Sequence, residues 1–304
     1  MENECRLVSS RGILKSCDIH SLVPHSSIQV LYQYNMPLDS STIGDSSTTI
    51  YLCTSAVFAN QALLKSLKHK FILVTGDSDT TCPIDIFRTT DEFEAFIAMP
   101  NLVHWFSQNC VLNGHAKLTG IPIGLNYHTL TNTTSYLGKQ AQPIDQERAL
   151  TRTRDKAAPF WEREVKCYDN FTHTNQLVSR RFAQDRIDAI ARIPAELVMR
   201  EACLVPRTQS WKTQANCAFV ISPLGNGLDC YRTWEALALG CIVIVKTSPI
   251  DYLYQDLPVW IVKEWSDVSA ESAHRVVSEF KDRVWNMDRL TLRYWMDKIN
   301  TITV

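Results

Sequence analysis

The chain has 304 residues, of which 45% are hydrophobic and 21% are charged, and its formal net charge at pH 7 is −1. This length and composition are sufficient for one large or two modest globular domains with hydrophobic cores. The near-neutral charge excludes a broad basic surface of the kind that binds nucleic acid or anionic membranes, so any phosphate site has to be local.

The ten cysteines show no CxxC or Cys/His metal spacing, and several fall within predicted strands or helices. We therefore expect buried, reduced thiols in a cytoplasmic protein rather than a disulfide framework. Sequons at Asn132 and Asn170 matter only in a secreted chain. We expect no signal peptide and no transmembrane segment, because the N-terminus lacks an apolar core and no run reaches roughly 18 apolar residues.

The first part of the chain alternates apolar, β-branched runs with helically spaced segments. Strands are predicted at residues 27–34, 49–53, 70–75, 102–106 and 118–123, and helices at 55–67 and 91–99. This alternation is typical of an α/β domain with a parallel sheet. We place this first domain at residues 1–140.

The polar stretch 131–159 is the predicted connection between two domains. Beyond it, helices are predicted at residues 160–165, 182–193, 195–200, 209–215, 229–239, 273–280 and 291–299, and strands at 217–221, 241–245 and 257–262. A short strand and a polar loop are expected between residues 165 and 182. The second domain is placed at residues 141–282, and residues 283–304 are expected to form a separate C-terminal helix.

A strand, a glycine loop, a helix and a second strand follow one another between residues 217 and 254. The loop contains Gly225 and Gly227, so its backbone can approach a ligand closely. Asp229 is the predicted N-cap of the helix, and Gly240 is its predicted stop. This order of elements is a βαβ unit, which builds parallel sheets.

Asp229, Arg232 and Glu235 recur at a spacing of three residues near the start of this helix. An arginine in a first turn opposes the helix dipole, and an anion held just beyond the helix start would explain its position. Glu235, one turn further on, could accept hydrogen bonds from a sugar hydroxyl. The pattern therefore predicts a nucleotide diphosphate with its ribose beside Glu235. A surface ladder of ion pairs is the alternative explanation.

Residues 222–265 resemble the C-terminal signature of exostosin-like glycosyltransferases of the family 47 type; they read SPLGNGLDCYRTWEALALGCIVIVKTSPIDYLYQDLPVWIVKEW. Other matching stretches are LVTGDSDTTCP, KLTGIPIGLNYHTL, and YDNFTHTN followed by Arg180 and Arg181. The chain looks especially like the small forms carried by large DNA viruses of algae, among them chlorella-virus xylosyltransferases. A viral chain of this kind would act in the host cytoplasm.

The resemblance implies a GT-B fold, in which two Rossmann-like domains with parallel sheets face each other across a cleft. It implies an inverting glycosyltransferase that moves a sugar, most readily xylose, from a UDP-sugar to a glycan acceptor hydroxyl. The partners expected are therefore UDP-xylose and a glycan, with no tightly bound cofactor and no required metal. The last helix would cross back to the first domain.

The candidate site residues fall into three groups. Donor-site candidates are Ser222, Gly225, Asn226, Gly227, Asp229, Arg232, Glu235, Lys246 and Arg207. Candidates for lining the acceptor side are His128, Arg180 and Arg181. The catalytic candidates are Asp77 and Asp79, which follow an apolar strand at the end where α/β folds place ligands.

Asp77 and Asp79 admit more than one interpretation. As a general base, one carboxylate would take the proton of the acceptor hydroxyl. The triplet Asp77-Ser78-Asp79 is also formally the DxD motif that binds a metal in GT-A glycosyltransferases, and it could be a structural turn. The glycine-loop unit far downstream favours the base, although the spacing does not separate Asp77 from Asp79. A non-catalytic sugar- or nucleotide-binding protein is the alternative function.

Overall fold

The computed structural model covers residues 1–304 and describes all of them except 21–47, 172–180 and 303–304. The strand predicted at residues 27–34 and the candidate Arg180 lie outside the described residues. Within the described part, the strands form a four-stranded and a five-stranded sheet, and every paired neighbour is parallel. The prediction of an α/β fold with two parallel sheets is confirmed.

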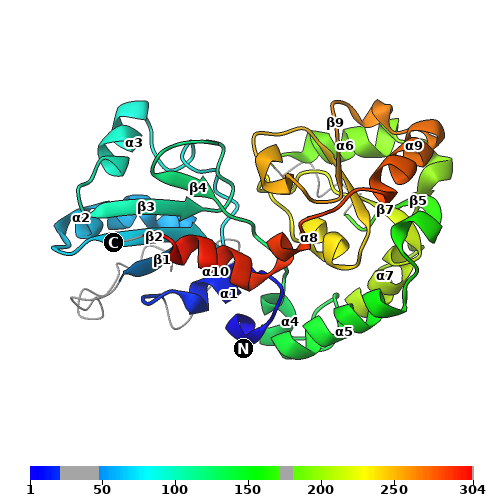
Figure 1. Ribbon diagram of the computed structural model, residues 1–304, viewed down its shortest axis with the longest axis horizontal. Coiled ribbons are helices and arrows are strands. Elements are labelled where there is room, and N and C mark those ends of the chain that lie inside the picture. Colours follow the sequence, from blue (N-terminus) through cyan, green and yellow to red (C-terminus); the bar gives the residue numbers. More distant parts are fainter. Residues whose placement is uncertain (21–47, 172–180, 303–304) are drawn as a thin grey trace.

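The four-stranded sheet and its helices form the first lobe, on the left of Figure 1. Its strands, in spatial order, are β1 (Thr49–Cys53), β2 (Phe71–Gly76), β3 (Leu102–Ser107) and β4 (Leu118–Gly120). Its flanking helices are η3 (Thr54–Ala56), α2 (Val57–Ser66) and α3 (Thr90–Ile97). In β2, Phe71 and Leu73 pack into one hydrophobic cluster, whereas Ile72 and Val74 pack into another. Burial on both faces explains why this strand is a continuous apolar run.

The five-stranded sheet and its helices form the second lobe, on the right of Figure 1. Its strands, in spatial order, are β6 (Val198–Met199), β5 (Glu164–Tyr168), β7 (Cys217–Ile221), β8 (Ile242–Lys246) and β9 (Val259–Val262). Its longer helices are α6 (Ala183–Arg192), α7 (Arg207–Gln214), α8 (Tyr231–Ala238) and α9 (Ala270–Lys281). The short turns η7 (Asp251–Tyr254) and η8 (Trp265–Asp267) flank β9.

Two predicted helices of the second lobe are wrong. Residues 160–165 form the short turn η4 (Phe160–Glu162) and then enter β5. Residues 195–200 form η6 (Ala195–Leu197) and then β6. Both segments pair in parallel within the same sheet, and this long-range pairing overrides their local helical pattern.

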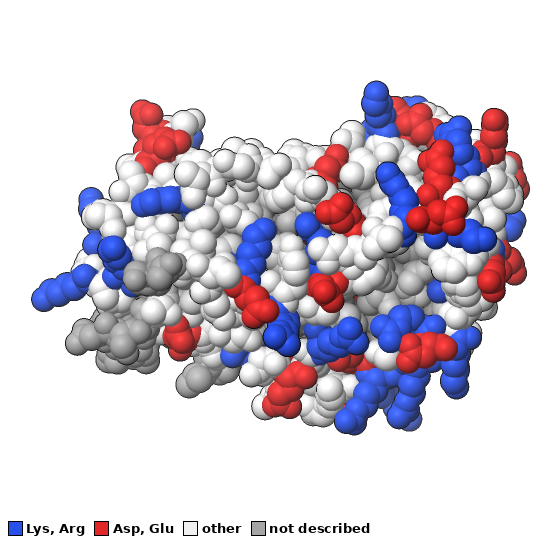
Figure 2. Space-filling model, in the orientation of Figure 1, with Lys and Arg blue, Asp and Glu red and all other residues white. Residues whose placement is uncertain are grey.

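The polar stretch predicted as a connection contains the helix α5 (Pro143–Lys156) after the short α4 (His128–Asn132). Pro143 stands at the start of α5, where its fixed φ favours a helix. Leu150, on the inner face of α5, packs into the core. The outer face of α5 is charged, and basic side chains gather along this edge of the molecule in Figure 2. The stretch is polar because the helix lies at the surface, not because it is an irregular linker.

The two ends of the described chain pack together on the first lobe. The helix α1 (Ser10–Ser16) follows the turn η1 (Glu2–Glu4), and α10 (Leu292–Asn300) follows η9 (Met287–Leu290). The amide of Leu292 donates a 2.8 Å hydrogen bond to the carbonyl of Arg6, and α10 lies beside α1 in Figure 1. Among the described residues, no helix combines the length and apolar character that crossing a bilayer requires.

Candidate functional site

A cavity of about 600 Å³ is lined by residues from both lobes. The first lobe contributes Asp79 and Ile123, and the second contributes the glycine loop and the start of α8. Most of the lining comes from the second lobe, at the carboxyl edge of its parallel sheet, where α/β folds bind ligands. The predicted donor-site residues that line the cavity are Gly225, Asn226, Gly227, Asp229, Arg232, Glu235 and Arg207.

The glycine loop packs closely against the first lobe. A Cβ atom on Gly227 would lie 3.0 Å from Asn109 Nδ2 and 3.3 Å from the Cα atom of Asp79, so a larger residue would force one of them to move. Asn109 itself donates to the carbonyl of Ser78 and accepts from the amide of Asp229. The glycine is therefore needed for the approach of the two lobes as well as for access to a ligand.

Asp229 is a buried hydrogen-bond acceptor and not the N-cap of α8, which is Cys230. Its carboxylate accepts from the amide of Cys230 at 2.9 Å and from Trp234 Nε1 at 2.8 Å. Burial raises the pKa of Asp229 to about 6, although these hydrogen bonds act in the opposite direction. The N-cap lies one residue later than predicted, because the side chain of Asp229 accepts from Cys230 and Trp234 and does not cap the first turn.

Two arginines from different helices meet beside the glycine loop. Arg186 of α6 donates from Nε to the carbonyl of Leu224 at 3.0 Å, and Arg232 of α8 donates from Nη2 to the carbonyl of Pro223 at 2.5 Å. Their guanidinium carbons lie 5.8 and 5.7 Å from the centroid of the Phe171 ring. Two guanidinium groups held this way, at a loop and a helix start, are suited to binding a diphosphate.

Glu235 forms a buried ion pair with Arg207, whose Nη2 lies 3.4 Å from Oε1. Its other oxygen accepts a 3.2 Å hydrogen bond from Trp211 Nε1. Arg207 also donates to the carbonyl of Asn126 at 2.6 Å. Glu235 therefore lines the cavity with a fixed orientation. Arg207 holds both Glu235 and the backbone at Asn126 in place.

Three other predicted residues lie away from the cavity lining. The hydroxyl of Ser222 contacts that of Thr233 beneath α8 at 2.7 Å. Lys246, at the end of β8, donates to Glu264 at 2.9 Å. Arg181 forms an ion pair with Asp85 of the first lobe. None of the three is among the residues that line the cavity in the described part of the chain.

The two catalytic candidates have different surroundings. Asp79 is partly buried and lines the cavity. Asp77 is buried behind the lining, where its Oδ2 lies 3.6 Å from Nε of Arg11. Burial raises the pKa of Asp77 to about 6, and the neighbouring Arg11 and Ser10 partly offset this effect. Of the two, Asp79 is the residue that lines the cavity.

His128 packs against the start of α8 behind the cavity lining. Its ring centroid lies 5.7 Å from that of Tyr231 in an edge-on arrangement. Burial lowers the pKa of His128 to about 3, and the cations Arg11 and Arg207 add to this effect. His128 is therefore packed behind the cavity and does not line it as predicted.

The sequence analysis missed several cavity residues. Tyr168 ends β5, and Asp169, Asn170 and Phe171 follow it; Arg200 and Glu201 follow β6, and Ser210 lies in α7. Arg186 had a recognisable signal, because it shares the buried face of a helix with Ala189 and Ile193 at positions i, i+3 and i+7. A charged residue on an apolar face indicates either a buried ion pair or a ligand.

No cluster of three or more His, Cys, Asp or Glu side chains with a metal-binding arrangement occurs among the residues that the structure describes.

Comparisons with known proteins found no matching family model and no matching curated protein. Among solved structures, the chain is similar to AviGT4, a glycosyltransferase involved in avilamycin A biosynthesis. The two share 14% sequence identity over 81% of this chain and 88% of that chain, with a TM-score of 0.33. A similarity of this size is too low to transfer a fold or an activity, so the architecture rests on the strands and helices described above.

Proposed function

We propose that this chain is a glycosyltransferase of the GT-B type that binds a UDP-sugar in the cavity between its lobes. The observation that carries the proposal is the convergence of Arg186 and Arg232 beside the glycine loop. A diphosphate placed there would receive charge-assisted hydrogen bonds from both guanidinium groups and from backbone amides at the start of α8. The resemblance of residues 222–265 to exostosin-like enzymes supports the same function.

Glu235 is the proposed acceptor for the ribose hydroxyls. It lines the cavity, and its ion pair with Arg207 and its bond from Trp211 leave lone pairs on both oxygens. Because these partners hold the carboxylate in place, little side-chain entropy would be lost on binding. UDP-xylose is the first donor to test, on the basis of the sequence resemblance.

Asp79 is the proposed general base. In inverting transfer, a carboxylate takes the proton of the acceptor hydroxyl while the oxygen attacks C1 of the sugar from the side opposite the diphosphate. The C1–O bond to the diphosphate breaks, and UDP leaves with the electron pair. Arg186 and Arg232 would neutralise the charge that develops on the leaving group, so we propose that no metal is required. Residues 1–140 would bind the acceptor and residues 141–282 would bind the donor. Residues 283–304 would form a C-terminal helix that crosses back to the first domain.

Calorimetry with UDP and uridine, followed by turnover of a panel of UDP-sugars, tests this function. We expect UDP to bind far more tightly than uridine, and one UDP-sugar to release UDP when a glycan acceptor is present. Turnover should persist in EDTA. The proposal is wrong if neither UDP nor any UDP-sugar binds, and binding without any turnover would favour the alternative of a nucleotide-binding protein.

A further inference from the structure

The side chains of Arg11 and Asp77 meet in the interior of the first lobe. Arg11 lies in the first turn of α1 and is 5% exposed, while Asp77 follows β2 and is 3% exposed. Arg11 Nε lies 3.6 Å from Asp77 Oδ2. Within the described part of the chain, neither oxygen of the Asp77 carboxylate accepts a hydrogen bond that meets standard geometry. A buried carboxylate with so few partners is uncommon and calls for an explanation.

The backbone at Asp77 is held in an unfavourable conformation. Its φ is 51°, in the left-handed region that residues other than glycine rarely adopt. The amide of Asp77 donates a 2.8 Å hydrogen bond to Gln108 Oε1. A Cβ atom on Gly76 would lie 2.5 Å from the hydroxyl of Tyr51, so a larger residue does not fit at position 76 unless Tyr51 moves. Backbone strain that the surroundings maintain in this way is typical of functional sites.

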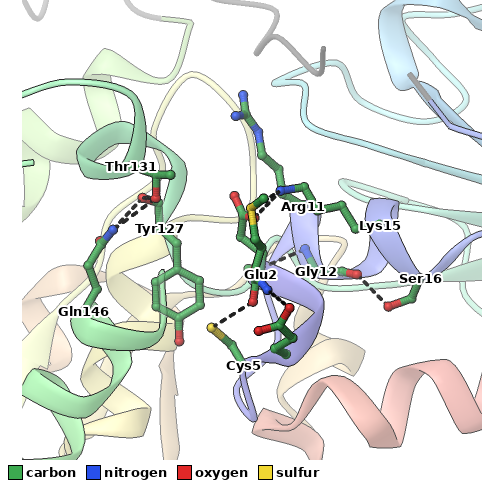
Figure 3. A network of polar contacts seen from close by, with 12 residues as sticks. Glu2, Cys5, Arg11, Gly12, Lys15, Ser16, Tyr127, Thr131 and Gln146 are labelled. Atoms are coloured by element: carbon green, nitrogen blue, oxygen red, sulfur yellow. Dashed lines mark hydrogen bonds and ion pairs between the residues drawn. The ribbon is translucent and has the colours of Figure 1, made fainter. Parts of the chain in front are cut away.

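The helix that carries Arg11 is fixed to the segment that leads into the cavity. The amide of Ser10 donates to the carbonyl of Ile123 at 2.9 Å, and the amide of Leu125 donates to the carbonyl of Val8 at 2.8 Å. A Cβ atom on Gly124 would lie 2.2 Å from that same Val8 carbonyl. One turn after Arg11 along α1, Lys15 pairs with Glu2 (Figure 3). These backbone contacts hold α1, and with it Arg11, in a fixed position relative to this segment.

The other ionisable groups near Asp77 do not supply a positive charge. Burial, with the charge of Asp77 as a further cause, raises the pKa of Tyr51 on β1 and of Tyr231 on α8, so both phenols stay neutral. Cys53 on β1 has its pKa raised to about 11 by burial, and His128 on α4 has its pKa lowered to about 3. Asp79, in the same loop, adds a second negative charge. Among the described groups that act on Asp77, Arg11 is therefore the one that supplies a positive charge.

We propose that Arg11 is a positioning residue of the site, which fixes the Asp77 carboxylate and keeps it ionised behind the cavity lining, in the same loop as Asp79. The inference rests on the proposed function, because it makes the N-terminal helix part of the machinery that prepares Asp79 to accept a proton. The sequence contained no indication of it, since Arg11 and Asp77 are far apart along the chain.

The first test is the pH profile of turnover for wild type, Arg11→Gln and Arg11→Lys. An opposite charge at this distance lowers a carboxyl pKa by roughly one to three units, so Arg11→Gln should raise the pKa of Asp77 by about that amount and move the pH range in which Asp77 is ionised upward. Arg11→Lys should restore most of the wild-type profile, and UDP affinity should change by no more than a few-fold. The matched control is Arg293→Gln, which removes an exposed arginine paired with Asp297. An equal loss of activity at every pH would indicate a structural role only and overturn the proposal.

The second test does not depend on sugar transfer. The carboxyl groups of ¹³C-aspartate-labelled protein are titrated by NMR, and the Asp77 signal is assigned with Asp77→Asn. In Arg11→Gln the midpoint of the Asp77 signal should rise, and an unchanged midpoint overturns the proposal. If the midpoint rises but wild-type protein neither binds nor uses a UDP-sugar, the Arg11–Asp77 pair stands and the proposed function fails. If Arg11→Gln does not fold, Arg11→Met, which also lacks the charge, takes its place, with the same rise of the Asp77 midpoint expected and the same unchanged midpoint overturning the proposal.

Discussion

The carboxylate of Asp229 in the second lobe accepts a 2.7 Å hydrogen bond from the backbone amide of Ile123 in the first. The same side chain accepts from Trp234 Nε1 and from the amide of Cys230, so it joins the start of α8 to the chain that lines the cavity. The relative position of the proposed donor and base residues therefore depends on a buried carboxylate. This contact leads to the first prediction.

Asp229→Asn should destabilise the protein by about 1–3 kcal/mol, because an amide nitrogen cannot accept the bonds that one carboxylate oxygen accepts. The change in the free energy of unfolding is measured by urea denaturation. Asp145→Asn is the control, since Asp145 forms an exposed ion pair with Arg148 on α5. Equal stabilities of the two variants would contradict the role assigned to Asp229.

Arg232→Ala and Arg186→Gln should each weaken the binding of UDP by about 1.5–3 kcal/mol, the usual value of a hydrogen bond to a charged group. Arg232→Lys should recover only part of the loss, because an ammonium cannot bind an oxygen pair as a guanidinium does. Calorimetry with UDP and with uridine measures the effect. Uridine lacks the diphosphate, so its affinity should be unchanged. An equal loss of affinity for both ligands would show that these arginines do not bind the diphosphate.

Glu235→Gln should weaken the binding of UDP more than that of 2′-deoxy-UDP, because the glutamate is the proposed acceptor for the ribose hydroxyls. The amide keeps the size of the side chain beside Arg207 and Trp211. Glu235→Ala, by contrast, should destabilise the protein by roughly 3–5 kcal/mol, since it leaves Arg207 buried without its partner. Paired calorimetry of both nucleotides and thermal denaturation separate the two effects. If Glu235→Gln weakens both nucleotides equally, the ribose assignment is incorrect.

Asp79→Asn should lower the rate of transfer by roughly 10²–10⁴ while UDP-sugar affinity stays within a few-fold of wild type. The reason is that a general base acts in the transition state and does not hold the donor. Turnover and calorimetric binding are measured on the same preparation, and Asp85→Asn, on the first lobe near Arg181, is the control. Normal turnover in Asp79→Asn would place the base elsewhere, with Asp77 as the next residue to test.

His128 should make the stability of the protein depend on pH. Its folded pKa of about 3 lies below the ordinary value of 6.5, so the unfolded chain binds a proton more readily than the folded one. The stabilisation is complete above pH 6.5 and is lost as the pH falls toward 3. His128→Gln should therefore cost more stability at pH 7.5 than at pH 4.5. Melting temperatures at several pH values test this, with the exposed His274→Gln as the control, and a penalty independent of pH would refute it.

Much of the fold was predictable from the sequence where burial was uniform. The strand β7 occupies the predicted residues 217–221, and β8 lies within one residue of its predicted bounds, because both strands are buried on both faces and read as continuous apolar runs. The glycine loop, the following helix and the stop at Gly240, with a φ of 76°, were recognisable for the same local reasons. By contrast, β5 begins at Glu164, inside a segment whose local pattern predicted a helix, and only its end overlaps the short strand expected after residue 165.

The candidate site was only partly predictable, since local patterns identify which residues face a ligand but not which distant residues join them. The sequence by itself determined the βαβ unit, Arg232 and Glu235 on its helix, and the aspartates after β2. Only the tertiary structure brought Arg186 beside Arg232, placed Asp79 at the cavity and Asp77 behind it, and paired Asp77 with Arg11. The physical reason is that a buried charge requires a partner, and that partner is selected by the packing of the whole chain rather than by its neighbours in sequence.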